Sequence, residues 1–453
     1  MLTRLRASGV LGAASALGSL GGAGAALWTF PCMLASAFVI AWGAEVAQFF
    51  MSQGLALAIL AWLQILPEFA VEADIAWRQN VVNMTANFTG SIRLLVGLGW
   101  PMIFAVSSLA HRRQTGEWLR EIVLEPDHSI EVVGLLVPIL YFGVVWWKAS
   151  LTVADAVILT VLYLAYLFVV NRMPPKDHEE AGELDAVPRR VMGLRPGVRG
   201  AAIVAMFLAG GATLYLVAHP FVDSLMSLAV TVGISEYVFI QWVAPFLSEF
   251  PEFLSAFRWA RTVRHAPMAL MNVVSSNINQ WTVLAGMIPV VYSISLGRVA
   301  AVPFDGMHRH EILLTILQSA LGMVLLMNMR YSWWEALLLF GLWFVQFCVP
   351  SLRVVVIDAY AALIALGLVQ ALFGRRRFAA FTMFGERWRH RVLLAVEDAQ
   401  VQEEQQPHER REGAVQPPVI GEGKQRGLGH GRGRGGLRRL TGTRAGASVR
   451  RTR

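Results

Sequence analysis

Two proline–glutamate pairs have the clearest chemical meaning in this sequence, because each lies inside a long apolar stretch. They are Pro67-Glu68 and Pro251-Glu252. A proline within a helix frees a backbone carbonyl, and a carboxylate beside it costs about 2.5–3.5 kcal/mol on membrane-insertion scales. Two carboxylates that converge with freed carbonyls would form an oxygen cage, which suits Ca²⁺. The alternative is two proline kinks with protonated glutamates packed between helices.

A second set of polar residues lies in the apolar stretch that follows each pair. Their amide and hydroxyl oxygens could complete a cation site, although small polar residues also mediate ordinary helix packing. Their position after the Pro-Glu pairs favours ligation. Glu249 and Glu72 lie one helical turn from Glu252 and Glu68 and could join the site or line its access path. The polar set is Asn87, Ser91, Asn272, Ser275, Ser276, Asn277, Asn279 and Gln280.

The composition indicates that most of the chain is embedded in a membrane. Hydrophobic residues make up 55% and charged residues 15%, whereas soluble proteins contain roughly 25% charged residues. Both cysteines lie in apolar runs, which excludes a disulfide framework. No catalytic or nucleotide-binding motif occurs, so we expect neither an enzyme nor a bound cofactor. A span needs about 20 apolar residues, and the predicted spans are 28–50, 52–77, 80–109, 130–147, 151–171, 199–230, 235–260, 267–296, 310–328, 332–349 and 353–373.

An internal repeat relates the two halves of the chain. Leu66-Pro67-Glu68-Phe69 recurs as Phe250-Pro251-Glu252-Phe253, and other landmarks recur at nearly the same offset. Each half holds five predicted spans, so the second half enters the membrane upside down, as in secondary transporters with a midplane site. The predicted fold is an all-α polytopic membrane protein with two inverted five-helix repeats plus one extra C-terminal transmembrane helix. The predicted segments are 1–27 (weakly ordered), 28–171 (first repeat), 172–198 (cytoplasmic loop), 199–349 (second repeat), 350–374 (extra helix) and 375–453 (basic, disordered cytoplasmic tail).

The distribution of basic residues predicts the orientation and the partners. The loops that face the cytoplasm carry more Lys and Arg if the N-terminus lies outside and the C-terminus inside a cell (inner or plasma) membrane. The net charge of +8 comes from the tail, whose residues Arg375 to Arg377 should bind anionic lipid headgroups. The Arg-Gly segment at 431–435 resembles nucleic-acid-binding segments, but this signal is weak, and we favour a solvated tail at the membrane surface without nucleic acid. The expected partners are therefore the lipid bilayer, anionic headgroups and transported cations.

These motifs resemble those of the calcium/cation antiporter superfamily, which includes sodium/calcium and calcium/proton exchangers. Its two alpha repeats each carry a Thr-Ser-x-Pro-Glu motif and a Gly-Ser-Asn-x-x-Asn motif. The resemblance covers about residues 28–349. It is specific at Pro67-Glu68, Gly90-Ser91, Pro251-Glu252 and Ser275-Ser276-Asn277.

The resemblance implies antiport of Ca²⁺, or another divalent cation, against Na⁺ or H⁺ by alternating access. Glu68 and Glu252 would bind the metal ion. By motif position, Ser91, Ser248, Ser276 and Asn277 would supply further oxygens. The complete set of expected cation-binding residues is Glu68, Glu252, Ser91, Ser248, Glu249, Ser276, Asn277, Gln64, Gln280, Asn87 and Asn272.

The first repeat departs from the family pattern. Gln64-Ile65 replaces Thr-Ser, and Ile92 and Leu95 replace the two Asn residues. These losses weaken the expectation of a Na⁺ site and favour H⁺ coupling or altered selectivity. Arg93 lies deep in a span, where it needs a partner. It could pair with Glu68, Glu249 or Glu252 as a modulator of the site, or face a water path. The alternative function is a degenerate, non-transporting membrane scaffold whose site Arg93 neutralises.

Overall fold

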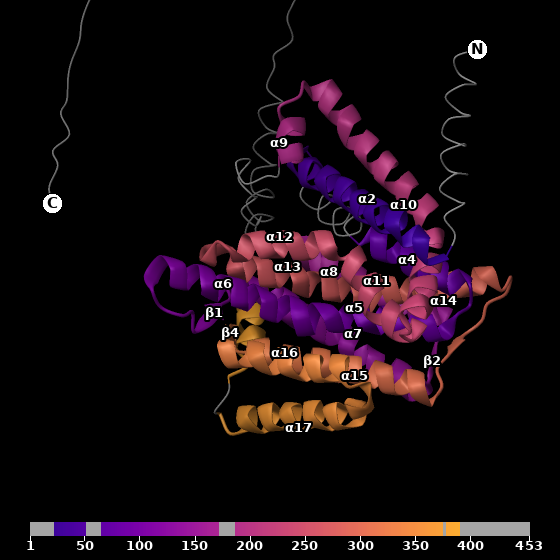
Figure 1. The fold of residues 1–453 in the computed structure, drawn as a ribbon. Coiled ribbons are helices and arrows are strands. Elements are labelled where there is room, and N and C mark those ends of the chain that lie inside the picture. Colours follow the sequence, from indigo (N-terminus) through magenta and orange to yellow (C-terminus); the bar gives the residue numbers. More distant parts are fainter. Residues whose placement is uncertain (1–21, 51–64, 172–185, 375–376, 390–453) are drawn as a thin grey trace, which may run out of the picture. The chain divides into compact units, whose positions relative to one another are not determined.

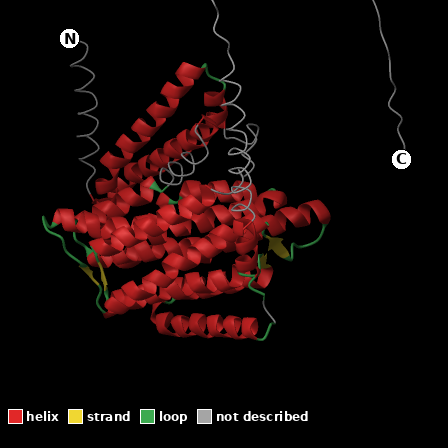
Figure 2. Cartoon of the chain, turned by 180° about the vertical axis from the view of Figure 1, so that it is seen from behind, coloured by secondary structure: helices red, strands yellow, loops and turns green. Residues whose placement is uncertain are grey.

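The computed structural model describes residues 22–50, 65–171, 186–374 and 377–389. They belong to one compact unit, Met1–Leu394, whereas the second unit, Ala395–Arg453, lies outside the described residues. The described part is helical apart from four short strands (Figure 2). The predicted ligand Gln64 and the tail beyond residue 389 also lie outside it.

Most of the described helices fall within predicted spans, although only residues 65–77 of the predicted span 52–77 are described. In the first half the helices are α2 (Ala26–Ala47), α4 (Leu66–Trp77), α5 (Val81–Leu94), the π-helical turn η3 (Leu95–Gly99), α6 (Trp100–Thr115), α7 (Ser129–Lys148) and α8 (Val153–Asn171). In the second half they are α9 (Ala186–Met192), α10 (Pro196–Val232), α11 (Glu236–Ser248), α12 (Phe250–Ala260), α13 (Ala266–Asn279), the π-helical turn η6 (Gln280–Leu284), α14 (Ala285–Ser295), α15 (Gly306–Leu326), α16 (Trp333–Cys348) and α17 (Arg353–Leu372). Short 3₁₀ turns are η1 (Gly22–Ala25), η2 (Gln48–Phe50), η4 (Pro126–His128), η5 (Val263–His265) and η7 (Pro350–Leu352).

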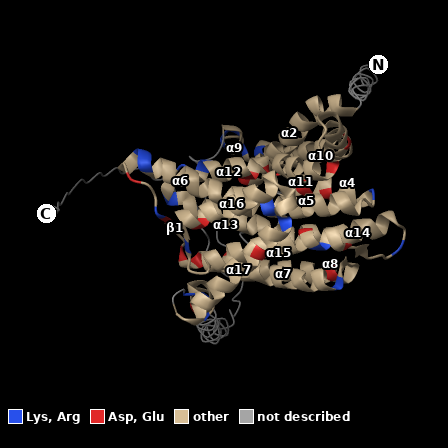
Figure 3. Cartoon of the chain, turned by 60° about the horizontal axis from the view of Figure 1, so that its bottom comes forward, with Lys and Arg blue, Asp and Glu red and all other residues tan. Residues whose placement is uncertain are grey.

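Seven helices among the described residues are long and apolar enough to cross a membrane. Charged side chains are sparse along them (Figure 3). The chain is therefore an all-helical, multi-pass membrane protein. The seven are Gly22–Ala47, Val81–Thr115, Pro126–Lys148, Val153–Asn171, Pro196–Val232, Gly306–Leu326 and Pro350–Leu372.

One predicted span is interrupted. We expected a continuous helix over 235–260, but α11 ends at Ser248 and α12 begins at Phe250. Pro251 lacks the N–H that a continuous helix would require at that position, so the chain breaks at Glu249 and starts a new helix. This break places Glu252 in the first turn of α12.

Two short strand pairs connect loops of the first half to loops of the second. β1 (Glu121–Val123) pairs antiparallel with β4 (Arg330–Ser332). β2 (Ser150–Leu151) pairs antiparallel with β3 (Val302–Pro303). Each half therefore contributes one strand to each pair, and the pairs join the ends of the helices that surround the interior.

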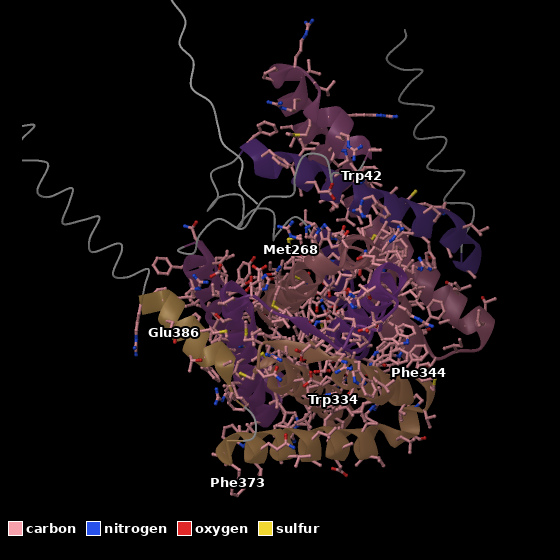
Figure 4. All side chains as sticks on the ribbon, turned by 90° about the vertical axis from the view of Figure 1, so that its left-hand side faces the viewer. Trp42, Met268, Trp334, Phe344, Phe373 and Glu386 are labelled. Atoms are coloured by element: carbon pink, nitrogen blue, oxygen red, sulfur yellow. The ribbon has the colours of Figure 1, made fainter. Side chains whose placement is uncertain are left out.

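The last described helices extend the fold beyond the predicted repeats. α17 lies along α15 (Figure 1), and Phe373 at its end is exposed (Figure 4). We predicted a disordered tail from residue 375, but the structure differs, because residues 379–389 are helical. The amide of Ala380 donates a hydrogen bond to Met327 O at 3.0 Å, and Arg387 Nε lies 3.0 Å from Asp127 Oδ1. Backbone and ionic contacts therefore hold the start of this segment against the body.

Candidate functional site

The two proline–glutamate pairs each begin a helix. Pro67 and Pro251 occupy the first turn of α4 and α12, where a missing N–H costs no helical hydrogen bond. This corrects the expectation of prolines in mid-helix. Glu68 and Glu252 consequently lie in the first turn of their helices, where the positive end of the helix dipole stabilises negative charge.

Two carboxylates meet around one amide, that of Gln280 in η6, and a third, Glu252, belongs to the same group of side chains. Gln280 Nε2 donates hydrogen bonds to Glu68 Oε1 and Oε2, at 3.3 and 3.1 Å, and to Glu249 Oε1. Glu252 accepts a hydrogen bond from Ser276 Oγ at 2.6 Å. Glu68 and Glu249 are buried, whereas Glu252 is partly exposed. We call Glu68, Glu249, Glu252, Ser276 and Gln280 the carboxylate cluster.

Oxygen atoms without a hydrogen-bond partner lie in and beside the carboxylate cluster, and the cluster has no basic partner among the residues that the structure describes. Glu249 Oε2 and Asn277 Oδ1 are buried without a hydrogen-bond partner among the described residues, although Asn277 Nδ2 donates to Gln280 Oε1 at 3.1 Å. No ion pair joins Glu68, Glu249 or Glu252 to a Lys or Arg within the described ranges. Unpaired buried oxygens and uncompensated buried carboxylates are both costly. A bound cation, or protons, would relieve both costs.

The carboxylate cluster does not have the density of ligands of a permanent metal site. In the part of the chain that the structure describes, no group of three or more His, Cys, Asp and Glu side chains could hold a metal ion by itself. A cation held between Glu68 and Glu252 would therefore need amide and hydroxyl oxygens as well. Such a sparse set suits an ion that must also leave.

The other predicted ligands are divided between this cluster and other places. Ser91 Oγ donates to Phe88 O at 3.1 Å and interacts with Glu68, so it lies at the cluster. Ser248 Oγ donates to Pro245 O at 3.2 Å, within its own helix. Among the described residues no hydrogen bond joins Asn272 to the three carboxylates.

The largest difference from prediction concerns Arg93. One alternative paired it with Glu68, Glu249 or Glu252, and the structure contradicts that alternative. Its Nη2 lies 2.6 Å from Glu311 Oε2, and its Nη1 donates to Gln346 Oε1 at 2.9 Å. Arg93 is only 2% exposed. It therefore does not neutralise the carboxylate cluster, so the scaffold alternative loses the neutralisation by Arg93 that it invoked.

Glu311 is the centre of this second cluster, and the sequence analysis did not single it out because it lies at the start of the predicted span 310–328. α15 begins earlier, at Gly306, so Glu311 falls in the interior of the helix and is fully buried. Arg353 Nη2 of α17 lies 2.5 Å from Glu311 Oε1, and Gln241 Nε2 of α11 donates to Oε2 at 3.1 Å. One carboxylate thus holds two arginines from α5 and α17.

Removing the charge of Glu311 should destabilise the protein. Glu311→Gln leaves Arg93 buried without a counter-charge, and loss of one partner of a buried pair costs about 3–5 kcal/mol. We expect a clear fall in the unfolding midpoint of the purified protein in detergent. Glu236→Gln, at an exposed helix start, is the control. Equal midpoints for the two variants would contradict a stabilising role for Glu311.

Comparison with known proteins supports what the geometry indicates. The family model described as "Sodium/calcium exchanger protein" matches residues 21–171 and again residues 202–351. No curated protein matches the chain. The solved structure of the H⁺/Ca²⁺ exchanger CAX is 30% identical, with a TM-score of 0.72, and the match covers 82% of this chain and 91% of that one.

The sodium-calcium exchanger NCX_Mj is a more distant relative in structure. Its structure in crystals soaked with 10 mM Na⁺ and zero Ca²⁺ is 17% identical to this chain, with a TM-score of 0.48, and the match covers 71% of this chain and 96% of that one. A soak with 2.5 mM Na⁺ and 10 mM Sr²⁺ gives 17% identity and a TM-score of 0.47, with the same coverage. The family model covers most of the chain in two repeats, and the chain therefore belongs to the sodium/calcium exchanger family.

Proposed function

We propose that this protein exchanges Ca²⁺, or another divalent cation, for H⁺ across a membrane by alternating access. Glu68 and Glu252 are the metal-binding carboxylates, and Glu249, Ser91, Ser276, Asn277 and Gln280 complete the site. The observation that carries the proposal is the carboxylate cluster itself, which has no basic partner in the described ranges and has buried oxygens without a hydrogen-bond partner in and beside it. Membership of the exchanger family supports it.

Several apolar residues favour H⁺ over Na⁺ as the coupling ion. Ile65, Ile92 and Leu95 are buried at motif positions where the resemblance implies hydroxyl or amide oxygens for Na⁺. Without those oxygens a monovalent metal ion has few ligands in the first repeat. A buried carboxylate that has lost its metal ion must instead be neutralised by a proton. The relative with 30% identity is itself described as an H⁺/Ca²⁺ exchanger.

The chemistry of exchange follows from the charges of the carboxylates. Ionised Glu68 and Glu252 carry two negative charges, which match one divalent cation. The N-terminal ends of α4 and α12 stabilise these charges when the metal ion replaces the protons. Protonation removes the charges and lowers the affinity of the site for the metal ion. The metal ion and the protons therefore occupy the same site at different stages of the cycle.

We further propose that residues 28–171 and 199–349 are inverted five-helix repeats, with 350–374 as an extra transmembrane helix. The backbone bonds between the halves support a two-fold relation. Leu124 N donates to Met329 O, and Phe304 N donates to Ala149 O, both at 2.9 Å. Exchanging the halves turns one bond into the other. The excess of basic residues in alternate loops supports an outside N-terminus and a cytoplasmic C-terminus in the cell (inner or plasma) membrane, with the basic tail near anionic headgroups.

An H⁺ gradient should drive Ca²⁺ uptake by the purified protein. Proteoliposomes that are acidic inside should accumulate ⁴⁵Ca²⁺, because outward H⁺ flow is coupled to inward Ca²⁺ flow. An outward Na⁺ gradient at equal pH should drive little uptake. Protein-free liposomes and an H⁺ ionophore are the controls. Uptake driven by the Na⁺ gradient alone would show that H⁺ is not the coupling ion. Absence of uptake under both gradients would refute Ca²⁺ exchange.

A further inference from the structure

Another buried carboxylate, Glu72, lies outside the carboxylate cluster. It follows Glu68 by one helical turn on α4 and is 0% exposed. Asn87 of α5, which is 1% exposed, donates a hydrogen bond from Nδ2 to Glu72 Oε2 at 2.6 Å. The sequence analysis placed Asn87 among the cation ligands. The structure pairs it with Glu72 instead, so we do not count it as a ligand of the metal ion.

The two remaining oxygens of this pair are complementary. Glu72 Oε1 and Asn87 Oδ1 are both buried without a hydrogen-bond partner among the described residues. If Glu72 is ionised, both atoms are acceptors and neither has a donor, which is costly in an interior. If Oε1 carries a proton, its O–H can donate to Oδ1 while Nδ2–H donates to Oε2. One proton therefore satisfies both oxygens in a cyclic acid–amide pair.

Within the described part of the chain, no ion pair joins Glu72 to a basic residue that would compete with a proton. On its own helix the nearest charged group is Glu68, which repels it. On α10, His219 and Asp223 contact Asp74 and Arg78 at the end of α4. Arg93 of α5 is bound to Glu311.

The remaining helices that pack against α4 are α2, α11 and α14. On α2 the charged residue is Glu45, which lies 3.9 Å from Arg258, and on α11 it is Glu236, which is exposed. α14 has no charged residue, and its titratable side chain is Tyr292. The described residues therefore offer Glu72 no basic side chain as a counter-charge. A proton can neutralise it without any additional protein group.

We propose that Glu72, paired with Asn87, is a proton-binding site that is linked to the metal site at Glu68. This inference rests on the proposed function. Glu72 and Glu68 lie on one face of α4, about 5–6 Å apart at their Cβ atoms by helix geometry. A divalent cation at Glu68 repels a proton at Glu72, so binding of the metal ion releases that proton. The protein then has one more titrating group than the metal ligands alone provide.

Proton release on Ca²⁺ binding tests this site without transport. Ca²⁺ is titrated into the purified full-length protein in detergent, by calorimetry in buffers with different ionisation enthalpies. Glu72→Gln keeps the shape of the side chain and its hydrogen bond from Asn87 but cannot release a proton. We expect the variant still to bind Ca²⁺ and to release about one proton fewer per Ca²⁺ bound. The reason is linkage: a residue that cannot bind a proton cannot contribute to the protons released when Ca²⁺ binds. Glu236→Gln should release as many protons as the wild type.

A second variant keeps a titrating group at this position. Asn87→Asp places two carboxyls side by side, and such a pair holds a shared proton more tightly. The extra proton should then be released only at higher pH than in the wild type. Unchanged proton release in Glu72→Gln, or an unshifted pH profile in Asn87→Asp, would overturn the proton site while leaving Ca²⁺ exchange intact. Failure of the wild type to bind Ca²⁺ would instead refute the proposed function, and the inference with it.

Discussion

Glu68→Gln and Glu252→Gln should each abolish Ca²⁺ transport. Glutamine has the shape of glutamate, but it removes a negative charge and replaces one acceptor oxygen by an NH₂ donor. Gln280 Nε2 now donates a hydrogen bond to Glu68, and Ser276 Oγ donates one to Glu252. In each variant the new NH₂ group can therefore face a donor instead of offering it an acceptor. Even changes to outer partners of metal ligands cost roughly 10–100-fold in affinity. We therefore expect each variant to lose at least ~100-fold in the initial rate of ⁴⁵Ca²⁺ uptake.

The control separates charge at the site from charge elsewhere. Glu236→Gln makes the same chemical change at an exposed helix start and should transport at the wild-type rate. All proteins are compared at equal amounts of monodisperse protein, reconstituted with the same H⁺ gradient. Near-normal uptake by Glu68→Gln or Glu252→Gln would mean that the carboxylate cluster does not carry the ion.

The sequence was sufficient to predict the class of protein, and it drew attention to Glu68 and Glu252, for physical reasons. A glutamate in a long apolar stretch is expensive, so its presence twice, each after a proline, was informative. The predicted halves, 28–171 and 199–349, nearly coincide with the two family matches. The resemblance to the calcium/cation antiporters is thereby confirmed.

Contacts between distant segments could not be predicted in the same way. Arg93 and Glu311 are 218 residues apart, and three other glutamates looked equally suitable as partners. Which acid an arginine reaches depends on how α5, α15 and α17 pack, and hydropathy carries no information about that. The same holds for Asn87, whose amide could face a cation or Glu72. A proline in an apolar run is also consistent with either a kink or a helix start, so the break at Glu249 was missed.

Gly90→Ala should damage the protein far more than an ordinary glycine substitution. A Cβ at Gly90 would lie 1.9 Å from Gln241 O and 2.8 Å from Gln241 C, which are backbone atoms of α11. Backbone atoms cannot change rotamer as a side chain can, so the clash would force α5 and α11 to move apart. Glycine at such a contact is what allows two membrane helices to approach closely. We expect overpacking to lower the free energy of unfolding by about 1–3 kcal/mol or more. The unfolding midpoint and the yield of folded protein should both fall.

The same separation should also reach the site. α5 carries Ser91, directly after Gly90, and α11 leads into Glu249 and Glu252, so moving the helices apart moves ligands of both repeats. Any folded Gly90→Ala protein should therefore take up ⁴⁵Ca²⁺ more slowly than the wild type. Gly143→Ala is the matched control, because a Cβ there has nothing within 4 Å and alanine is the better helix former. If the two alanine variants unfold and transport alike, close contact between α5 and α11 is not what sets the geometry of the carboxylates.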